Sequence, residues 1–248
     1  MRKIIATIGS VLLLALSITS SSAQEKDKDK DKQKDKDKPR IEGSGNIVTR
    51  DIAVQPFDAL SVSGVFSVSL IQGTKEQVKI EADDNLQDLF EVKNEGSVLK
   101  ISMKKDVNFN AKKKIKLSIS FKNLKSMELS MVGNFSSEGN LSFDNLKLDS
   151  KSVGAVDLAL NVQKLDINNT GVGNLKLSGK ADNVVIKNNG VGSLKASDLL
   201  VQTMDIENEG VGSAEVNAAK ELKVKDSFLG KVTNVGSAPV KRMNKVVI

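Results

Sequence analysis

The chain has 248 residues, of which 27% are charged and 39% are apolar, enough for one sizeable hydrophobic core. It contains no Cys, His, Trp or Tyr, which excludes disulfide bonds, thiol nucleophiles, zinc sites built from imidazole or thiolate, and catalysis by histidine. The net charge is +6 and the pI is 9.3, but most of the basic excess lies in the segment 1–40. Because the remainder is nearly neutral and has no Trp or Tyr to stack on bases, nucleic-acid binding is not expected.

Residues 1–23 have the pattern of a cleavable signal peptide. Arg2 and Lys3 form a basic head, an apolar run is centred on residues 11–16, and cleavage is expected after Ala23. A membrane anchor is the alternative, but the apolar run is shorter than the roughly 20 residues of a spanning helix. We therefore expect export to the periplasm, the cell surface or the exterior, with no transmembrane segment after cleavage. Since the chain has no Cys, it cannot become a lipoprotein through a lipidated cysteine.

Residues 25–38 alternate positive and negative charges and contain no apolar residue. Such a segment has nothing to bury, so residues 24–43 are expected to form a disordered linker. The linker is either a spacer or low-complexity sequence without a role. A single folded domain is expected over residues 44–248, with an irregular first half over residues 44–130.

That first half contains short segments in which apolar and polar residues alternate, as in strands with one buried face. They are residues 60–70, 78–80, 99–103 and 115–121. Between them, Asp84 and Gln87 have the spacing of a helix N-cap and its partner, which predicts a short helical turn. The acidic residues 81–84 suggest either a metal site or a solvated cap of this turn, and the cap is favoured.

Lysines gather in one stretch between two of these strand patterns. They are Lys104, Lys105, Lys112, Lys113, Lys114 and Lys116, accompanied by a single acidic residue, Asp106. As a hairpin loop, this stretch would attract an anionic glycan, a lipid headgroup or an acidic protein through a field that salt weakens. Alternatively, the lysines serve solubility or guard an exposed strand edge.

A Val-Gly signature recurs from residue 131 onward. Its glycines are Gly133, Gly154, Gly173, Gly192, Gly212 and a degenerate Gly230. They are spaced at about 20 residues, a period that is typical of solenoids. The residues two after, six before and eight before the glycine are apolar, whereas the residue seven before it is mostly charged. This alternation predicts a strand with one buried face, and all length variation falls in one turn of the repeat.

When the repeats are aligned on their glycines, equivalent residues form columns, and these columns predict which side chains face the core. The buried set is Leu175, Leu177, Val184, Ile186, Val191, Leu194, Ile206 and Val211. The solvent-facing set is Lys176, Asp166, Lys195, Asp205 and Glu207.

Two polar or small columns are expected to have structural roles. Four residues before each repeat glycine, from the second repeat on, stand Ser150, Asn169, Asn188, Asn208 and Asp226. A stacked Asn column can form a ladder of side-chain hydrogen bonds, which is favoured over a ligand site. The repeat glycines, with Gly171, Gly190 and Gly210 two positions earlier, are expected to supply positive φ or close backbone approach.

Three segments carry a resemblance to a known family: FDALSVSGVFSV at residues 57–68, VKIEADDNL at 78–86 and GVGNL at 171–175. With them the chain resembles the auto-transporter adhesin "head GIN domain" family of exported bacterial proteins, over roughly residues 44–235. The resemblance implies a right-handed parallel β-helix (β-solenoid), here with coils of about 20 residues. We expect regular repeats over 131–235 and a C-terminal cap over 236–248. The resemblance also implies an adhesion-like role, and it offers no catalytic residues to carry over.

The expected function is therefore that of a non-enzymatic exported β-solenoid that contacts an envelope or extracellular partner, which could be a protein, an anionic glycan or a lipid surface. No catalytic, cofactor or metal residues are predicted, and the six lysines form the candidate interaction patch. One alternative is a polysaccharide lyase or hydrolase, which could use carboxylate pairs without His, although sugar subsites usually rely on Trp or Tyr. Another is a scaffold that polymerises through the ends of the solenoid.

Overall fold

The computed structural model describes residues 40–243, and the predicted signal peptide and most of the predicted linker lie outside them. In chain order the strands are β1 (Arg40–Glu42), β2 (Ile47–Ala53), β3 (Ala59–Val65), β4 (Ser67–Gln72), β5 (Gln77–Asp83), β6 (Phe90–Glu95), β7 (Val98–Met103), β8 (Asn108–Asn110), β9 (Lys116–Phe121), β10 (Ser126–Val132), β11 (Phe135–Ser150), β12 (Val153–Asn169), β13 (Val172–Asn188), β14 (Leu194–Asn208), β15 (Ala214–Asp226), β16 (Val232–Asn234) and β17 (Val240–Arg242), and a 3-10 helix, η1, covers Asp84–Leu89.

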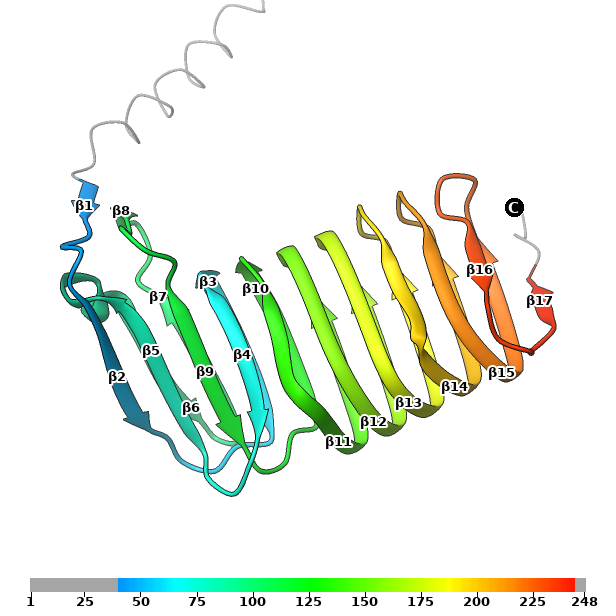
Figure 1. Ribbon diagram of the computed structural model, residues 1–248, viewed down its shortest axis with the longest axis horizontal. Helices are drawn as coiled ribbons and strands as arrows, with labels where there is room; N and C mark the ends of the chain where they lie inside the picture. Colours follow the sequence, from blue (N-terminus) through cyan, green and yellow to red (C-terminus); the bar gives the residue numbers. More distant parts are fainter. Residues whose placement is uncertain (1–39, 244–248) are drawn as a thin grey trace, which may run out of the picture. The chain divides into compact units, whose positions relative to one another are not determined.

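Residues 126–234 form a stack of parallel coils (Figure 1). Each long strand pairs with the equivalent strand of the next coil, so that Val156, Leu175, Leu194 and Ala214 stand in one column. The predicted β-solenoid is thus confirmed, with coils of about 20 residues. Register shifts between neighbouring coils occur at residues 136–140, 176–178 and 196–200, close to the turn in which the sequence places the length variation.

Each coil has two limbs, joined by a bend at one edge of the stack and by a tight corner at the other (Figure 1). In the coil of β13 the bend lies near Gly179, and the corner contains Val191 and Gly192. We use "bend" and "corner" in this sense throughout. Apolar side chains of the two limbs meet between them and form one continuous core.

The first half continues the same stack. Strand β3 pairs in parallel with β10 on one side and β7 on the other, and β4 pairs in parallel with β11 and β9. Strands β3 and β4 are therefore the two limbs of one coil, and β7 and β9 are the limbs of the next coil outward. Beyond them, β2, β5 and β6 add antiparallel pairs.

The helical turn predicted near residue 84 is confirmed as η1, but its predicted cap is wrong. Asp84 is the first residue of η1, and Gln87 donates its side-chain amide to the carbonyl oxygens of Val48 and Ile80. The solvated cap is also wrong for Asp83, which is fully buried. Its carboxylate accepts hydrogen bonds from the backbone N–H groups of Gly45 and Lys112, at 2.7 and 3.1 Å, and so fastens two loops. Within residues 40–243, no group of three or more Asp and Glu side chains is placed to hold a metal ion.

Most of the core prediction is confirmed. Six of its eight members are at most 3% exposed: Leu175, Leu177, Val184, Ile186, Leu194 and Ile206. The five residues predicted to face solvent are exposed or half-buried. The prediction is wrong for Val191 and Val211, which are 50% and 47% exposed. Each valine lies five residues after a buried isoleucine, Ile186 or Ile206, and this odd offset places it on the outer face of the alternating strand.

The repeat glycines allow the corners to stack. Five of them, from Gly133 to Gly212, have φ between +132° and +137°, a region that residues with a Cβ rarely adopt. A Cβ on Gly192 would also lie well inside the van der Waals distance of the Gly173 carbonyl oxygen, one coil away. Gly230 departs from the pattern, because its φ is not positive and a Cβ there would meet Gly210 instead. The predicted role of glycine is confirmed in all six repeats, through positive φ in five of them and through close backbone approach at Gly230.

The predicted asparagine ladder lies directly inside the corners. The Asn169 Nδ2 donates to Asn188 Oδ1 at 2.7 Å, and the Asn188 Nδ2 donates to Asn208 Oδ1 at 2.6 Å. The Asn208 Nδ2 donates to the carbonyl oxygen of Gly230, where the ladder ends. Because Asn188 and Asn208 are buried, these bonds satisfy polar groups that would otherwise be costly to desolvate.

At the C-terminal end, Asp226 takes the ladder position and binds different partners. Burial raises the pKa of Asp226, but hydrogen bonds from Arg242 and from the Val232 N–H lower it by more. The pKa of Asp226 therefore lies below its ordinary value. Asp226 thereby ties β15 to β16 and β17, the last two strands, which both pair in parallel with β15.

The corner geometry predicts that Gly192→Ala destabilises the protein more than Gly139→Ala. Gly139 also has positive φ, at 75°, but a Cβ there would have no heavy atom within 4 Å. We expect Gly139→Ala to lower the free energy of unfolding by about 1–2 kcal/mol, the cost of the left-handed backbone alone. Gly192→Ala should cost at least about 3 kcal/mol, because a steric clash is added. Denaturant unfolding of both variants checks this, and equal losses would contradict the close stacking of the corners.

Candidate binding surfaces

The lysine loop, residues 104–116, is the expanded corner of the coil formed by β7 and β9. The predicted hairpin is wrong, because β7 and β9 are opposite limbs of one coil and do not pair with each other. Within the loop, β8 pairs with β1 in a separate two-stranded sheet. The Gly43 N–H donates to the Asn110 carbonyl oxygen at 2.8 Å, which holds this part of the loop in place.

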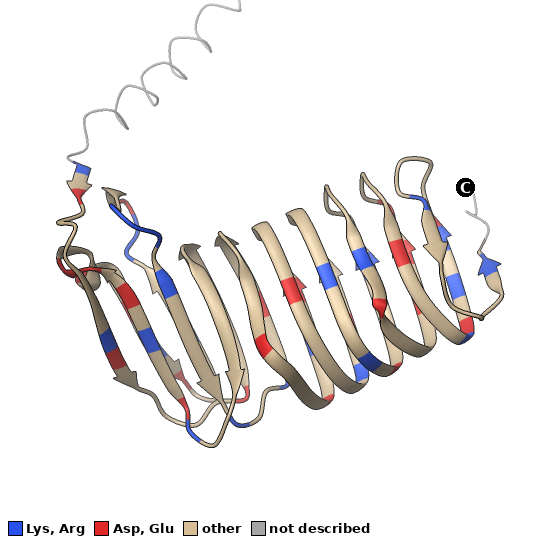
Figure 2. Cartoon of the chain, viewed as in Figure 1, with Lys and Arg blue, Asp and Glu red and all other residues tan. Residues whose placement is uncertain are grey.

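All six predicted lysines are exposed, and they differ in their partners. Lys116 forms an ion pair with Glu81 at 2.9 Å, and Lys112 lies 3.7 Å from Glu42. Lys113 and Lys114 form no ion pair with the residues that the structure describes. Figure 2 shows positive charge concentrated along this loop, at one end of the row of corners.

The lysine loop forms one wall of an apolar hollow of about 770 Å³. Lys112, Lys113 and Lys114 line it together with Phe109 and Ile115 of the same loop. The opposite wall comes from the corners of the two neighbouring coils, with Val65 and Val132. Three cationic groups therefore stand beside an apolar depression, which suits a partner with both anionic and apolar parts.

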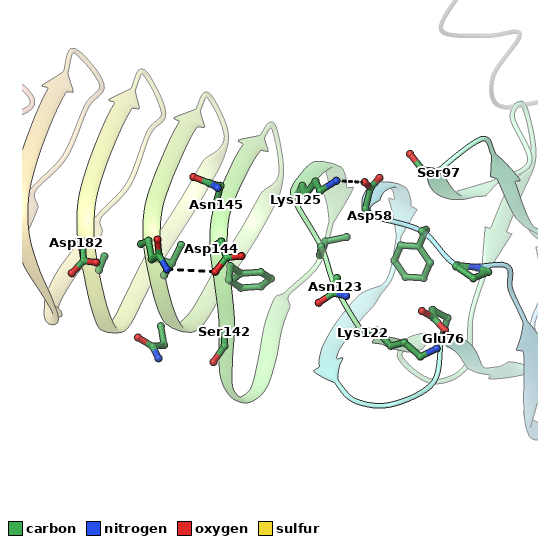
Figure 3. Close-up of a pocket in the computed structure, with 18 of the residues that line it drawn as sticks. Asp58, Glu76, Ser97, Lys122, Asn123, Lys125, Ser142, Asp144, Asn145 and Asp182 are labelled. Atoms are coloured by element: carbon green, nitrogen blue, oxygen red, sulfur yellow. Dashed lines mark hydrogen bonds and ion pairs between the residues drawn. The ribbon is translucent and has the colours of Figure 1, made fainter.

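A second depression, the bend groove, lies at the bends where the chain passes from β9 to β10 (Figure 3). It encloses about 1230 Å³ and is lined mainly by amide, carboxylate and lysine side chains. Asp144, Gln163 and Asp182 occupy the same position in three successive coils and follow one another along its wall. This hydrogen-bonding surface can receive a polar ligand such as a sugar, but its two phenylalanines, Phe57 and Phe143, are buried and offer little ring surface.

An ion pair fixes one side of the bend groove. The Lys125 Nζ donates to the Asp58 carboxylate at 2.8 Å (Figure 3). Hydrogen bonds from Lys125 and from Ser97 hold the pKa of Asp58 below its ordinary value. The same bond raises the pKa of Lys125. Both groups therefore remain charged over a wider pH range than isolated side chains.

The lysine cluster was predicted from the sequence, whereas the bend groove was not. A signal for the groove is present, because the residue ten positions before the repeat glycine is Asp144, Gln163, Asp182 or Gln202 in successive repeats. Asp58 and Lys125 also line the groove, but no repeat pattern predicts this, since the pairing of β3 with β10 brings their distant segments together.

These features define a parallel β-solenoid with a cationic corner loop and a polar groove. The model of the family described as "Putative auto-transporter adhesin, head GIN domain" matches residues 56–238. The chain belongs to this family, as the motifs in its sequence predict. No curated protein matches the chain.

Several solved structures share the fold. A Bacteroides fragilis protein described as a putative adhesin is 29% identical, with a TM-score of 0.71, and the match covers 82% of this chain and 100% of that one. A Parabacteroides distasonis protein described as a putative lipid binding protein is 17% identical, with a TM-score of 0.58 over 83% of this chain and 100% of that one. A Parabacteroides merdae protein described as a putative adhesin is 21% identical, with a TM-score of 0.52 over 83% and 99%.

The groove geometry predicts that Lys125→Met raises the pKa of Asp58. The substitution removes the hydrogen bond that contributes most to the lowered pKa, while the bond from Ser97 remains. Titration of the Asp58 carboxyl by NMR should show a higher midpoint in the variant than in the parent. Lys122→Met is the control, because Lys122 pairs with Glu76 and should leave Asp58 unchanged. An identical Asp58 midpoint in parent and Lys125→Met would show that the ion pair does not form in solution.

Proposed function

We propose that this protein is a non-catalytic, adhesin-like attachment protein that binds an anionic surface through its lysine loop. The observation that carries the proposal is the position of Lys112, Lys113 and Lys114 beside an apolar hollow, on a domain that is slightly acidic outside the lysine loop. Clustered cations create a local field that attracts anionic partners, whereas isolated surface lysines are screened by their acidic neighbours. Membership of a family described as adhesins supports a binding role.

The bend groove is the place to consider catalysis, since β-helices also host polysaccharide-cleaving enzymes. Cleavage of a glycosidic bond by a carboxylate pair requires a general acid that stays protonated, and therefore a raised pKa. Asp58, which lines the groove, has the opposite shift and stays ionised to lower pH. Asp58 is therefore unsuited to serve as that general acid.

The proposal includes the location and organisation inferred from the sequence. Residues 1–23 act as a signal peptide, residues 24–43 act as a linker, and the solenoid domain of residues 44–248 works in the periplasm, at the cell surface or outside the cell. Among residues 40–243, no helix is long and apolar enough to span a membrane. The partner is an envelope or extracellular component with anionic groups, and no cofactor is required.

We expect the triple substitution of Lys112, Lys113 and Lys114 to Glu to abolish retention on an anionic polysaccharide matrix at low salt. Each change reverses a charge at the hollow, and because all three side chains are exposed the unfolding midpoint should not change. The matched control changes Lys147, Lys164 and Lys195 to Glu, which alters the net charge equally on exposed positions of the coils. Retention of the first variant at the level of the parent would refute the proposed role of the loop.

A further inference from the structure

A row of exposed apolar side chains runs along the corners of the solenoid. It comprises Val65, Val132, Val153, Val172, Val191, Val211, Phe228 and Leu229, which we call the valine ridge. The six valines are each between 47% and 51% exposed, Leu229 is 60% exposed and Phe228 is 98% exposed. The ridge accounts for eight of the 14 large apolar residues that are exposed in the described part of the chain. Their exposed surface is therefore concentrated along one edge.

Backbone pairing shows that the ridge is continuous. Val65 pairs with Val132, Val132 with Val153, and Val153 with Val172. Isolated parallel bridges then join Val172 to Val191 and Val191 to Val211. The Gly212 N–H donates to the Leu229 carbonyl oxygen at 2.9 Å, as the Gly192 N–H donates to Val211 at 2.8 Å, so Leu229 takes the next place. Six steps of about 4.8 Å give the ridge a length of about 30 Å.

The lysine loop stands in line with this ridge. The coil of β7 and β9 lies next to the coil of β3 and β4, and its corner is the lysine loop, where the neighbouring corner carries Val65. The hollow beneath Lys112, Lys113 and Lys114 includes Val65 and Val132, the first two members of the ridge. One edge of the molecule therefore carries cations at one end, valines along its length and an exposed phenylalanine at the other end.

The solenoid fold does not need valine at these positions. The valines point away from the core. The glycines allow the corners to stack closely, and the asparagine ladder joins neighbouring coils by hydrogen bonds. Half of each valine surface remains in contact with water, at a cost in free energy that a polar residue would avoid. A role in contact with an apolar partner explains this placement.

We propose that the valine ridge docks on an anionic lipid surface, with the lysine loop contacting the headgroups. This inference rests on the proposed function and identifies the anionic surface as lipid. A straight row with one side chain per coil can touch a planar surface along its whole length. Shallow insertion of apolar side chains together with nearby lysines is how interfacial protein segments bind anionic membranes. The exposed ring of Phe228 fits the same interface.

Vesicle flotation of residues 24–248, the chain that remains after the proposed signal cleavage, tests this proposal. The vesicles contain either phosphatidylcholine alone or equal parts of phosphatidylcholine and phosphatidylglycerol, at low salt. The ridge variant changes Val153, Val172 and Val191 to Ser. The control changes Val185 and Leu200 to Ser, since these apolar residues are 37% and 41% exposed and lie outside the ridge. All variants begin at residue 24, because the apolar run of residues 1–23 would itself bind vesicles.

We expect the parent and the control to float with phosphatidylglycerol vesicles only. The ridge variant should bind at least about tenfold more weakly, because three apolar contacts with the bilayer are lost. Its unfolding midpoint should match that of the parent, since the substituted side chains contribute little to the core.

Other outcomes overturn the inference and separate it from the proposed function. If the ridge variant floats as well as the parent, or if the parent does not bind vesicles but is retained on the anionic polysaccharide matrix through its lysine loop, the lipid proposal is wrong and the proposed function stands. If the parent binds neither the vesicles nor the matrix, both fail. If the parent is a dimer without lipid in sedimentation and the ridge variant is a monomer, the ridge is an interface between two copies of this chain, and the lipid proposal is again wrong.

Discussion

The spacing between coils is the constraint on which the rest of this structure depends. Backbone hydrogen bonds hold neighbouring coils about 4.8 Å apart along both limbs, and the corners must keep the same spacing while the chain reverses direction. At the corner of β13 there is no room for a Cβ between Gly192 and the Gly173 carbonyl oxygen, and φ is +132°. Glycine meets both conditions, and its recurrence sets the period of the sequence.

Two further features follow from these corners. Backbone amides of the corners donate to carbonyl oxygens of the neighbouring coil, and the buried side chains of the ladder from Asn169 to Asn208 bond to one another at the same coil spacing. The residue before each glycine is turned outward, which places one valine per coil on the surface. Where the coil of β7 and β9 replaces the tight corner by the lysine loop, the same edge gains a cluster of positive charge and a hollow. The geometry that stacks the coils thus also arranges the candidate binding surfaces.

Local patterns in the sequence predicted the parallel stack, its period, most of the core and the asparagine ladder, because each coil repeats the same contacts with its neighbour. The errors fall where the local pattern stops being sufficient. Val191 and Val211 are apolar, but they lie at an odd offset from the buried Ile186 and Ile206, so their strands point them outward and hydrophobicity alone misplaced them. The lysine loop lies between two strand patterns, as a hairpin would, yet its flanking strands pair with other coils. Asp83 is buried by two loops that are distant from it in sequence, and no local pattern encodes these contacts.

Native-state hydrogen exchange at the corners tests the central claim most directly. The amides of Gly173 and Gly192 donate to the carbonyl oxygens of Val191 and Val211 on the following coil, each at 2.8 Å. If the corners are stacked in this way, both amides should exchange as slowly as mid-strand amides such as that of Ile186, because opening any of them requires the coils to separate. Exchange of the two glycine amides at the rate of an open surface loop, such as that around Phe228, would contradict the account.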